Sequence, residues 1–189
     1  SKRIALAEEL RLARPAQSEI EARLPPVAPF NDDPRLPGLV EELRARLEDR
    51  PDDLEGHILL ARNEAALGRF AEAYRAQARV AALRGPGQDF ADLADLMVIA
   101  AGGYVSPEAE QALVAALERD PTNGTARYYA GLLAVQTGRP DQAFTLWQPL
   151  LEEGPADAPW VAPLRAQLPE IASLAGVRYQ LPPLVGGPG

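Results

Sequence analysis

The sequence predicts an all-α protein in which pairs of helices are repeated along the chain. Alanine and leucine dominate its 189 residues while β-branched and aromatic residues are sparse, and this composition favours helices over sheets. The apolar fraction of 47% is large enough for a sizeable core. The third observation is a recurring order of small, aromatic and turn residues, in which Gly68 recurs as Gly138 and Pro121 recurs as Pro155. We therefore expect a helical repeat protein.

The spacing of these residues indicates the kind of repeat. Pro121 and Pro155 are 34 residues apart, which is the period of the tetratricopeptide repeat (TPR), a helical hairpin. Gly68 and Gly138 are 70 residues apart, which corresponds to two such units and an insertion of two residues. The predicted fold is thus an all-α TPR solenoid of about three repeats with capping helices.

The chain divides into three predicted parts. Residues 1–36 should form an N-terminal helical arm and a Pro-rich linker, because two helix-forming stretches precede a run of prolines that lack backbone donors. Residues 37–175 should form the TPR domain, and the Gly- and Pro-rich residues 176–189 a flexible tail. The chain starts at Ser1 and shows no signal-peptide pattern, so we interpret it as a fragment or a processed form.

The first elements of the TPR domain follow from apolar periodicity and turn residues. A helix over 39–50 should act as a half-repeat, because its apolar residues share one face and Pro51 stops it. The first complete unit should pair a helix over 54–67 with one over 70–83. Gly68 supplies the left-handed conformation that the short turn between them requires.

The middle unit should be less regular than the first. Its first helix begins near Phe90, and the two inserted residues fall in an enlarged turn over 101–107. Ser106 as N-cap and Pro107 at the first helical position predict the start of the second helix. This helix should end at Pro121.

The third unit should start from an N-cap at Thr122 or Asn123. Pro140 starts its partner helix, which Pro149 should interrupt and kink near its end. A capping helix should follow from Trp160, because the last repeat of a solenoid otherwise exposes an apolar face. We also expect this capping helix to be broken at Pro169.

Charge and composition exclude several classes of function. The net charge of −8 and the pI near 4.8 disfavour nucleic acid as a partner and favour a basic or amphipathic peptide. The chain has no cysteine, so disulfides and thiolate chemistry are excluded. The longest mostly apolar run, 96–101, is far shorter than the ~20 residues of a membrane span.

No constellation of residues predicts catalysis, a metal or a cofactor. His57 is the only histidine and occupies the slot where the repeat pattern has tryptophan, so it should pack between helices. The acidic clusters lack the spacing of an EF-hand and suit helix capping. Asp89 and Asp92 are the exception, because they lie one turn apart on a helix expected to line the groove. Gly102-Gly103 is expected to form a turn and not a phosphate cradle.

A peptide-binding groove is the expected functional site. The first helix of each stacked pair lines the concave face, where one ligand can touch several repeats. Counting from each repeat start places ten residues there, namely Glu55, Ile58, Arg62, Asp89, Asp92, Leu96, Ile99, Tyr128, Leu132 and Val135. This apolar strip with charged edges suits an amphipathic helix. Asp89 and Asp92 could meet lysines of the client, and Arg62 could meet a carboxylate.

Several segments resemble a narrower group than TPR proteins in general. They are PDDLEGH at 51–57, ALGRFAEA at 66–73, AAGG at 100–103 with SPEA at 106–109, LERDPTN at 117–123, and Ala143 with Trp147. This pattern resembles the periplasmic domain of the cytochrome c maturation protein family CcmI, also called CycH. The resemblance covers residues 39–153, and it departs from the family pattern at His57, Ala61 and Pro149.

The resemblance implies a function without catalysis. Members of the CcmI family are chaperones that capture the C-terminal helix of apocytochrome c and deliver it to the haem-ligation subunits CcmF and CcmH. The resemblance also implies the periplasmic domain of a bacterial inner-membrane protein, attached through an N-terminal anchor that this chain lacks. The alternative that the residues leave open is a TPR scaffold that assembles another envelope or cytoplasmic complex.

Overall fold

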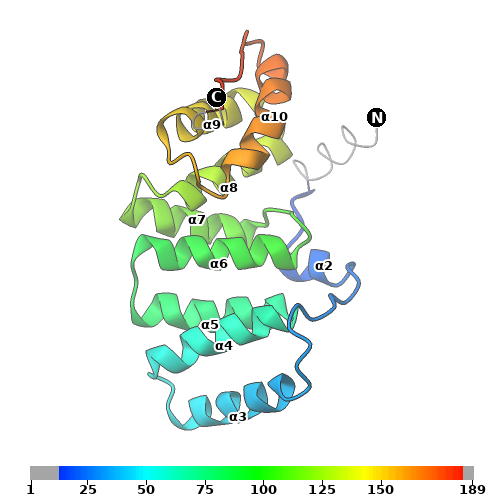
Figure 1. Ribbon diagram of the computed structural model, residues 1–189, viewed down its shortest axis with the longest axis vertical. Coiled ribbons are helices and arrows are strands. Elements are labelled where there is room, and N and C mark those ends of the chain that lie inside the picture. The colour runs from blue at the N-terminus through cyan, green and yellow to red at the C-terminus, as the bar shows by residue number, and fades with distance from the viewer. Residues whose placement is uncertain (1–12, 185–189) are drawn as a thin grey trace. The chain divides into compact units, whose positions relative to one another are not determined.

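The computed structural model describes residues 13–184, and within them every regular element is a helix (Figure 1). The elements are α2 (Gln17–Glu21), α3 (Leu36–Asp49), α4 (Leu54–Ala66), α5 (Phe70–Leu83), α6 (Gly87–Ala100), α7 (Pro107–Arg119), α8 (Gly124–Gln136), α9 (Pro140–Glu153) and α10 (Val161–Leu174). The predicted all-α TPR fold is confirmed. The helix-forming stretch over residues 4–14 lies almost entirely outside the described residues.

The helices form two compact units, which are described separately below. The N-terminal unit runs from Pro15 to Pro121 and contains α2 to α7, and the C-terminal unit contains α8 to α10. In the first unit α4 packs against α5, α5 against α6, and α6 against α7. In the second unit α8 packs against α9, and α9 against α10. Within each unit, helices that follow one another in the chain therefore pack against one another.

The turns of the hairpins are set by glycines with positive φ. Gly68 (φ 73°) joins α4 to α5, and Gly138 (φ 74°) joins α8 to α9. A side chain at either position would be strained, so the recurring glycine of the sequence has a backbone cause. The middle hairpin has a longer turn, as expected, which contains Gly102 and Gly103. Val105 and Ser106, which follow them in this turn, are fully buried.

Side-chain caps start three of the helices. The side chain of Asp53 accepts a hydrogen bond from the backbone N–H of residue 56. In the same way Ser106 accepts from the N–H of residue 109, and Asn123 from that of residue 126. Such caps satisfy backbone donors that the helix leaves free. Of the two predicted caps for α8, Asn123 is the one that the structure uses.

The N-terminal unit packs through small side chains. Ala73 of α5, Ala91 and Ala94 of α6, and Ala116 of α7 are all 0% exposed. The half-repeat helix α3 is anchored on the unit by Val40 and Leu47, which are its buried residues. The core of this unit is therefore made from close helix contacts more than from large rings.

The arm ahead of α3 is folded onto the N-terminal unit. Tyr104 donates to the carbonyl oxygen of Pro15 at 2.8 Å, and the Gln17 amide donates to that of Met97 at 2.7 Å. Further along, Tyr74 donates to Glu21 at 2.9 Å, and the backbone N–H groups of residues 30 and 31 donate to the carbonyl oxygen of residue 66 at 2.8 and 3.0 Å. In Figure 1 the arm passes the ends of α5 and α6.

The C-terminal unit packs around one tryptophan. Trp147 is 0% exposed, donates its indole N–H to the carbonyl oxygen of Tyr128 at 2.9 Å, and stacks on the Tyr128 ring. Gly131 lies against the indole, where a Cβ atom would overlap with Trp147. The capping helix α10 adds Leu164 and Leu168, both fully buried. This core depends on a large ring seated against a glycine.

The expected interruptions at two prolines do not occur. α9 runs through Pro149 to its end at Glu153, and α10 runs through Pro169. Leu150 and Leu151 follow Pro149 and are buried in the core, so packing offsets the lost backbone hydrogen bond. The prediction that these helices would be interrupted or broken was wrong.

Part of the predicted tail is packed against the C-terminal unit. The ring of Tyr179 contacts that of Phe144 edge to face, with ring centres 5.3 Å apart. Arg165 of α10 donates to the carbonyl oxygen of Pro182 at 2.8 Å. The stretch between these two contacts therefore adds to the cover of α9 and α10.

Candidate functional site

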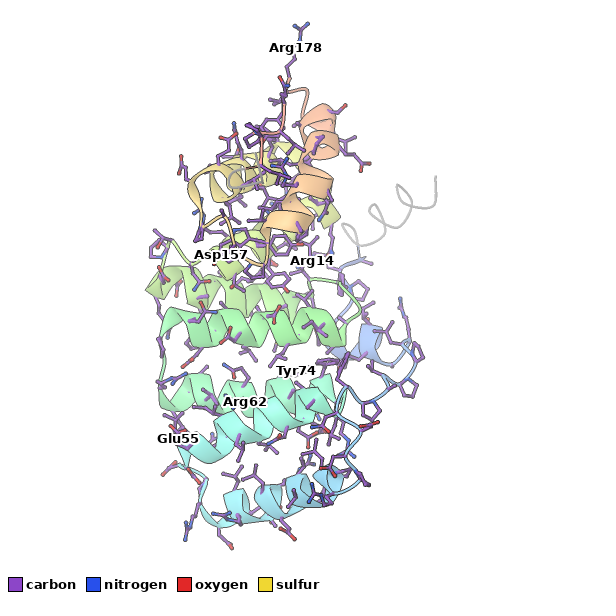
Figure 2. All side chains as sticks on the ribbon, viewed as in Figure 1. Arg14, Glu55, Arg62, Tyr74, Asp157 and Arg178 are labelled. Atoms are coloured by element: carbon purple, nitrogen blue, oxygen red, sulfur yellow. The ribbon has the colours of Figure 1, made fainter. Side chains whose placement is uncertain are left out.

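The predicted groove residues of α4 lie on one exposed side of that helix. Asp53 caps α4, so Glu55, Ile58 and Arg62 follow at helical spacing and share a face. Glu55 and Arg62 are exposed and Ile58 is half-buried. Figure 2 shows Glu55 where α4 begins and Arg62 further along it. Within the described residues Arg62 makes no hydrogen bond or ion pair, so its guanidinium is available to a partner.

On α6 three of the four predicted residues are accessible. Asp92 is exposed, Leu96 is half-buried and Ile99 is 42% exposed. Partial desolvation raises the pKa of Asp92, the hydrogen bond from Gln88 opposes this, and the carboxylates of Asp95 and Asp89 add to it. A cation from a partner would relieve this crowding of negative charge.

Asp89 corrects the expectation for this helix. It is 2% exposed, and Arg84 donates two hydrogen bonds to its carboxylate, at 3.0 and 2.7 Å. The first turn of α6 is held against α5, because the Gln77 amide donates to the backbone carbonyl of Asp89 at 3.0 Å. The carboxylate is therefore matched within the chain and does not face a client lysine. The signal was Arg84, five residues earlier and across the Gly85-Pro86 turn.

The predicted groove residues of α8 also serve the core. Tyr128, Leu132 and Val135 are half-buried and pack against the core of the C-terminal unit. The pKa of Tyr128 is raised by burial, with a hydrogen bond to Gln167 of α10 acting against the rise. The accessible predicted residues therefore lie on α4 and α6 in the N-terminal unit and on α8 in the C-terminal unit.

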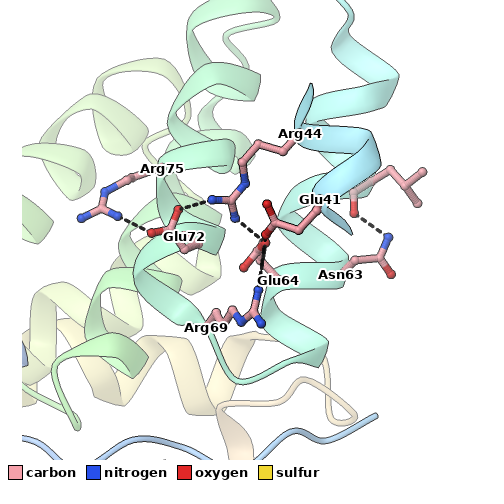
Figure 3. Close-up of polar contacts among 8 residues, drawn as sticks. Glu41, Arg44, Asn63, Glu64, Arg69, Glu72 and Arg75 are labelled. Atoms are coloured by element: carbon pink, nitrogen blue, oxygen red, sulfur yellow. Dashed lines mark hydrogen bonds and ion pairs between the residues drawn. The ribbon is translucent and has the colours of Figure 1, made fainter. Parts of the chain in front are cut away.

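An ion-pair network that the sequence reasoning missed holds α3 to the first hairpin (Figure 3). Glu64 of α4 is fully buried, and Arg44 of α3 donates to it at 2.7 Å. Glu72 of α5 pairs with Arg75 at 2.7 Å and lies 3.7 Å from Arg44. The bond to Glu64 raises the pKa of Arg44. The network crosses three helices, and a pattern read along one helix does not show it.

His57 has a structural role. It is 7% exposed, and its Nε2 lies 2.8 Å from the carbonyl oxygen of Pro51, to which it donates. Among the described residues no three His, Cys, Asp or Glu side chains are grouped so that they could hold a metal ion. None of the described helices has the length and apolarity needed to cross a membrane.

The N-terminal unit carries nearly all of the negative charge. Residues 15–121 contain 20 Asp and Glu residues and 11 arginines, which gives a net charge of −9. Residues 122–189 contain five acidic and four basic residues, which gives −1. The field that would steer a basic partner therefore comes from the unit that also holds the exposed faces of α4 and α6.

Comparison with known proteins agrees with this architecture. A family described as tetratricopeptide repeat matches residues 107–168. A cytochrome c-type biogenesis protein CycH of Bradyrhizobium diazoefficiens is 38% identical over 126 residues, which are 66% of this chain and 34% of that protein. The CycH of Rhizobium meliloti is 32% identical over 157 residues, covering 72% of this chain and 41% of the relative. The chain spans well under half the length of either relative.

The stacked hairpins, the glycine turns and the exposed helix faces define a TPR domain, a class that binds other polypeptides. Within that class the two relatives narrow the assignment. The chain is a CcmI-like TPR domain, similar to the cytochrome c-type biogenesis protein CycH.

Proposed function

We propose that this domain is a non-catalytic chaperone of cytochrome c maturation, and that it binds the C-terminal amphipathic helix of apocytochrome c. The observation that carries the proposal is the exposed surface of α4 and α6 in a CcmI-like TPR unit of strongly negative charge. The proposed binding residues on this surface are Glu55, Ile58, Arg62, Asp92, Leu96 and Ile99. Asp89 is not among them, because its carboxylate already accepts two hydrogen bonds from Arg84.

The chemistry of this surface suits an amphipathic helix with basic residues. Ile58, Leu96 and Ile99 offer apolar area for the apolar face of such a helix, while Asp92 offers a carboxylate for a lysine. The net charge of −9 raises the rate of encounter with a basic segment more than it raises the final affinity. Arg62 supplies the opposite charge and so favours one orientation of the bound helix.

The C-terminal unit contributes a second surface in this proposal. Tyr128, Leu132 and Val135 of α8 remain half-exposed beside the core of this unit and offer an apolar surface of their own to the client. In the complete protein, an N-terminal anchor would hold the domain at the periplasmic side of the inner membrane. The domain would deliver its client to the haem-ligation subunits CcmF and CcmH.

Calorimetry with a peptide of an apocytochrome c C-terminal helix tests the proposal. We expect the peptide to bind and a scrambled peptide of equal charge to bind at least tenfold more weakly, because the apolar residues must share one face to meet the surface. Equal affinities for the two peptides would reject the proposal.

Charge variants locate the binding surface. Asp92→Lys should weaken binding of the basic peptide, whereas Glu48→Lys makes the same charge change on the exposed side of α3 and should leave it nearly unchanged. Helical circular dichroism checks that both variants fold. If the two variants weaken binding equally, only the net charge matters and α6 is not the site.

The second candidate function is a TPR scaffold of another complex. It is favoured by the match to the tetratricopeptide repeat, because repeats of this class bind many different polypeptides. Pull-down from a periplasmic extract separates the two: enrichment of c-type apocytochromes supports the first function, and enrichment of unrelated proteins supports the second.

A further inference from the structure

A hollow of about 450 Å³ opens in the N-terminal unit beside the folded arm. Its walls are the arm over residues 21–27, the first turn of α5 and the last turn of α6. Figure 1 shows where these three segments lie in the unit. The size lies within the range of small-ligand and side-chain pockets. Only Ile99 of its lining belongs to the proposed peptide surface.

Exposed apolar side chains gather around this hollow. Leu24 is 40%, Val27 49% and Ile99 42% exposed, and all three line it. Phe30, which is 74% exposed, contacts Phe70 on the wall of the hollow, with ring centres 6.1 Å apart. Apolar side chains that remain exposed together, and not singly, mark an interaction site.

The wall formed by the arm is held in place before any ligand binds. Val27 lies against Gly68 and Leu24 lies against Gly102, where added Cβ atoms would come within 3.2 Å of the two side chains. These two glycines therefore let the arm sit close to the hairpin turns. The bond between Tyr74 and Glu21 fixes the middle of the arm. Burial and this bond raise the pKa of Tyr74 to about 12, so the tyrosine stays protonated and keeps donating.

We propose that this hollow, the arm pocket, accepts one large aromatic side chain, best a tryptophan, from a basic helical partner. Phe70 and two prolines of the arm offer flat apolar faces on which a ring can pack. Glu21 and Glu72 also line the pocket; their carboxylates accept hydrogen bonds from Tyr74 and Arg75, and an ionised carboxylate has further acceptor positions that favour the positive edge of a ring and the indole N–H. Buried aromatic anchors of this kind dominate the affinity of many interfaces.

The identity of the partner rests on the proposed function. Ile99 belongs both to the arm pocket and to the surface of α6 on which the client helix is proposed to lie. An aromatic residue near one end of that helix would enter the pocket while the rest of the helix covers α6. The net charge of −9 on residues 15–121 selects a partner whose flanking residues are basic.

The pocket is first tested without any client. N-acetyl-tryptophanamide is titrated into the full ¹⁵N-labelled chain, and amide shifts should concentrate at Gly68, Ala71 and Gly102. Ala71→Phe fills the pocket and should abolish them, while Ala82→Phe, an exposed position later on the same helix, should not. Shifts that are absent, or spread over the chain, overturn the proposal. If Ala71→Phe does not fold, Leu24→Ser removes one wall and should weaken the same shifts.

The second test uses an amphipathic, lysine-containing 20-residue helical peptide with one terminal tryptophan, and a copy with alanine there. The tryptophan should give about tenfold higher affinity for the wild type, and this gain should vanish in Ala71→Phe but not in Ala82→Phe. If both peptides bind equally, the pocket proposal fails while the proposed function stands. If neither binds, the proposed function fails, and the titration alone decides on the pocket. Loss of self-association in Ala71→Phe, measured by sedimentation, would make a second copy the occupant and overturn the proposal.

Discussion

The two units solve the same packing problem with different side chains. The N-terminal unit brings its helices together through alanines and holds α3 with an ion pair between the buried Glu64 and the partly exposed Arg44. The C-terminal unit seats Trp147 against Gly131 and closes with α10. Charge divides in the same way, with −9 on residues 15–121 and −1 on residues 122–189. The unit suited to attract a basic partner therefore has a close-packed interior of small residues, whereas the nearly neutral unit relies on a large aromatic core.

The largest test of this comparison removes the central ring of the C-terminal unit. Trp147→Ala deletes a fully buried side chain and its hydrogen bond to the Tyr128 carbonyl, and it should cost about 3–5 kcal/mol. Hydrogen exchange followed by mass spectrometry should show faster exchange across α8 to α10 and little change in α4 to α7. If exchange accelerates equally in both units, they unfold together and their cores are not independent.

The second test removes the arginine of this ion pair in the N-terminal unit. Arg44→Met leaves Glu64, which is 0% exposed, without its 2.7 Å partner and with only the more distant Arg69, at 4.0 Å, beside it. We expect a loss of about 2 kcal/mol, reduced from the cost in a dry interior because Arg44 itself is 37% exposed. Urea denaturation measures the loss, and hydrogen exchange should locate it at α3.

Two further variants isolate the contribution of the ion pair. Arg46→Met changes an exposed arginine on the same helix and should have little effect. The double variant Arg44→Met with Glu64→Leu removes both charges and should recover most of the lost stability. If the double variant is as unstable as Arg44→Met alone, the cost comes from lost packing and not from the unpaired carboxylate.

The helices could be predicted from the sequence because their signals are local. The glycine turns, Pro107 and the side-chain caps act within four residues of their own position, and each is found where it was expected. Pro149 misled the prediction because the burial of its neighbours is a tertiary effect that offsets the local one. Periodicity therefore predicts the elements, while burial decides how a helix tolerates a proline.

The candidate site was less predictable for the same physical reason. Helical spacing predicts which residues share a face, as it does for Ile58 and Arg62, but it does not show what packs there. Asp89 has the right spacing and is nevertheless buried under the contact with Arg84. The fold of the arm onto Gly68 and Gly102 depends on contacts between distant residues. No periodic pattern carries that information.

A smaller test compares one helix cap from each unit. Ser106→Ala and Asn123→Ala each remove a side-chain acceptor for a backbone N–H at the start of a helix. Each should cost about 1 kcal/mol. Thermal unfolding measures the total, and hydrogen exchange should place the first loss at α7 and the second at α8. Faster exchange in the other unit would show that the two units are coupled in unfolding and do not lose stability independently.

The smallest expected effect concerns the negative charge of the N-terminal unit. The pKa of Asp92 is raised in the folded protein, first by desolvation, so the unfolded chain releases this proton at a lower pH than the folded one. Stability should therefore fall as the pH rises from the ordinary aspartate range through the raised pKa, and this loss is complete above it. Asp92→Asn removes the charge and should gain about 0.5 kcal/mol at neutral pH, because solvent screens a partly exposed group. Other carboxylates titrate in the same range, so the measurement is the difference in urea stability between the wild type and Asp92→Asn at several pH values. A difference that does not grow with pH would show that the charge of Asp92 does not destabilise the folded N-terminal unit.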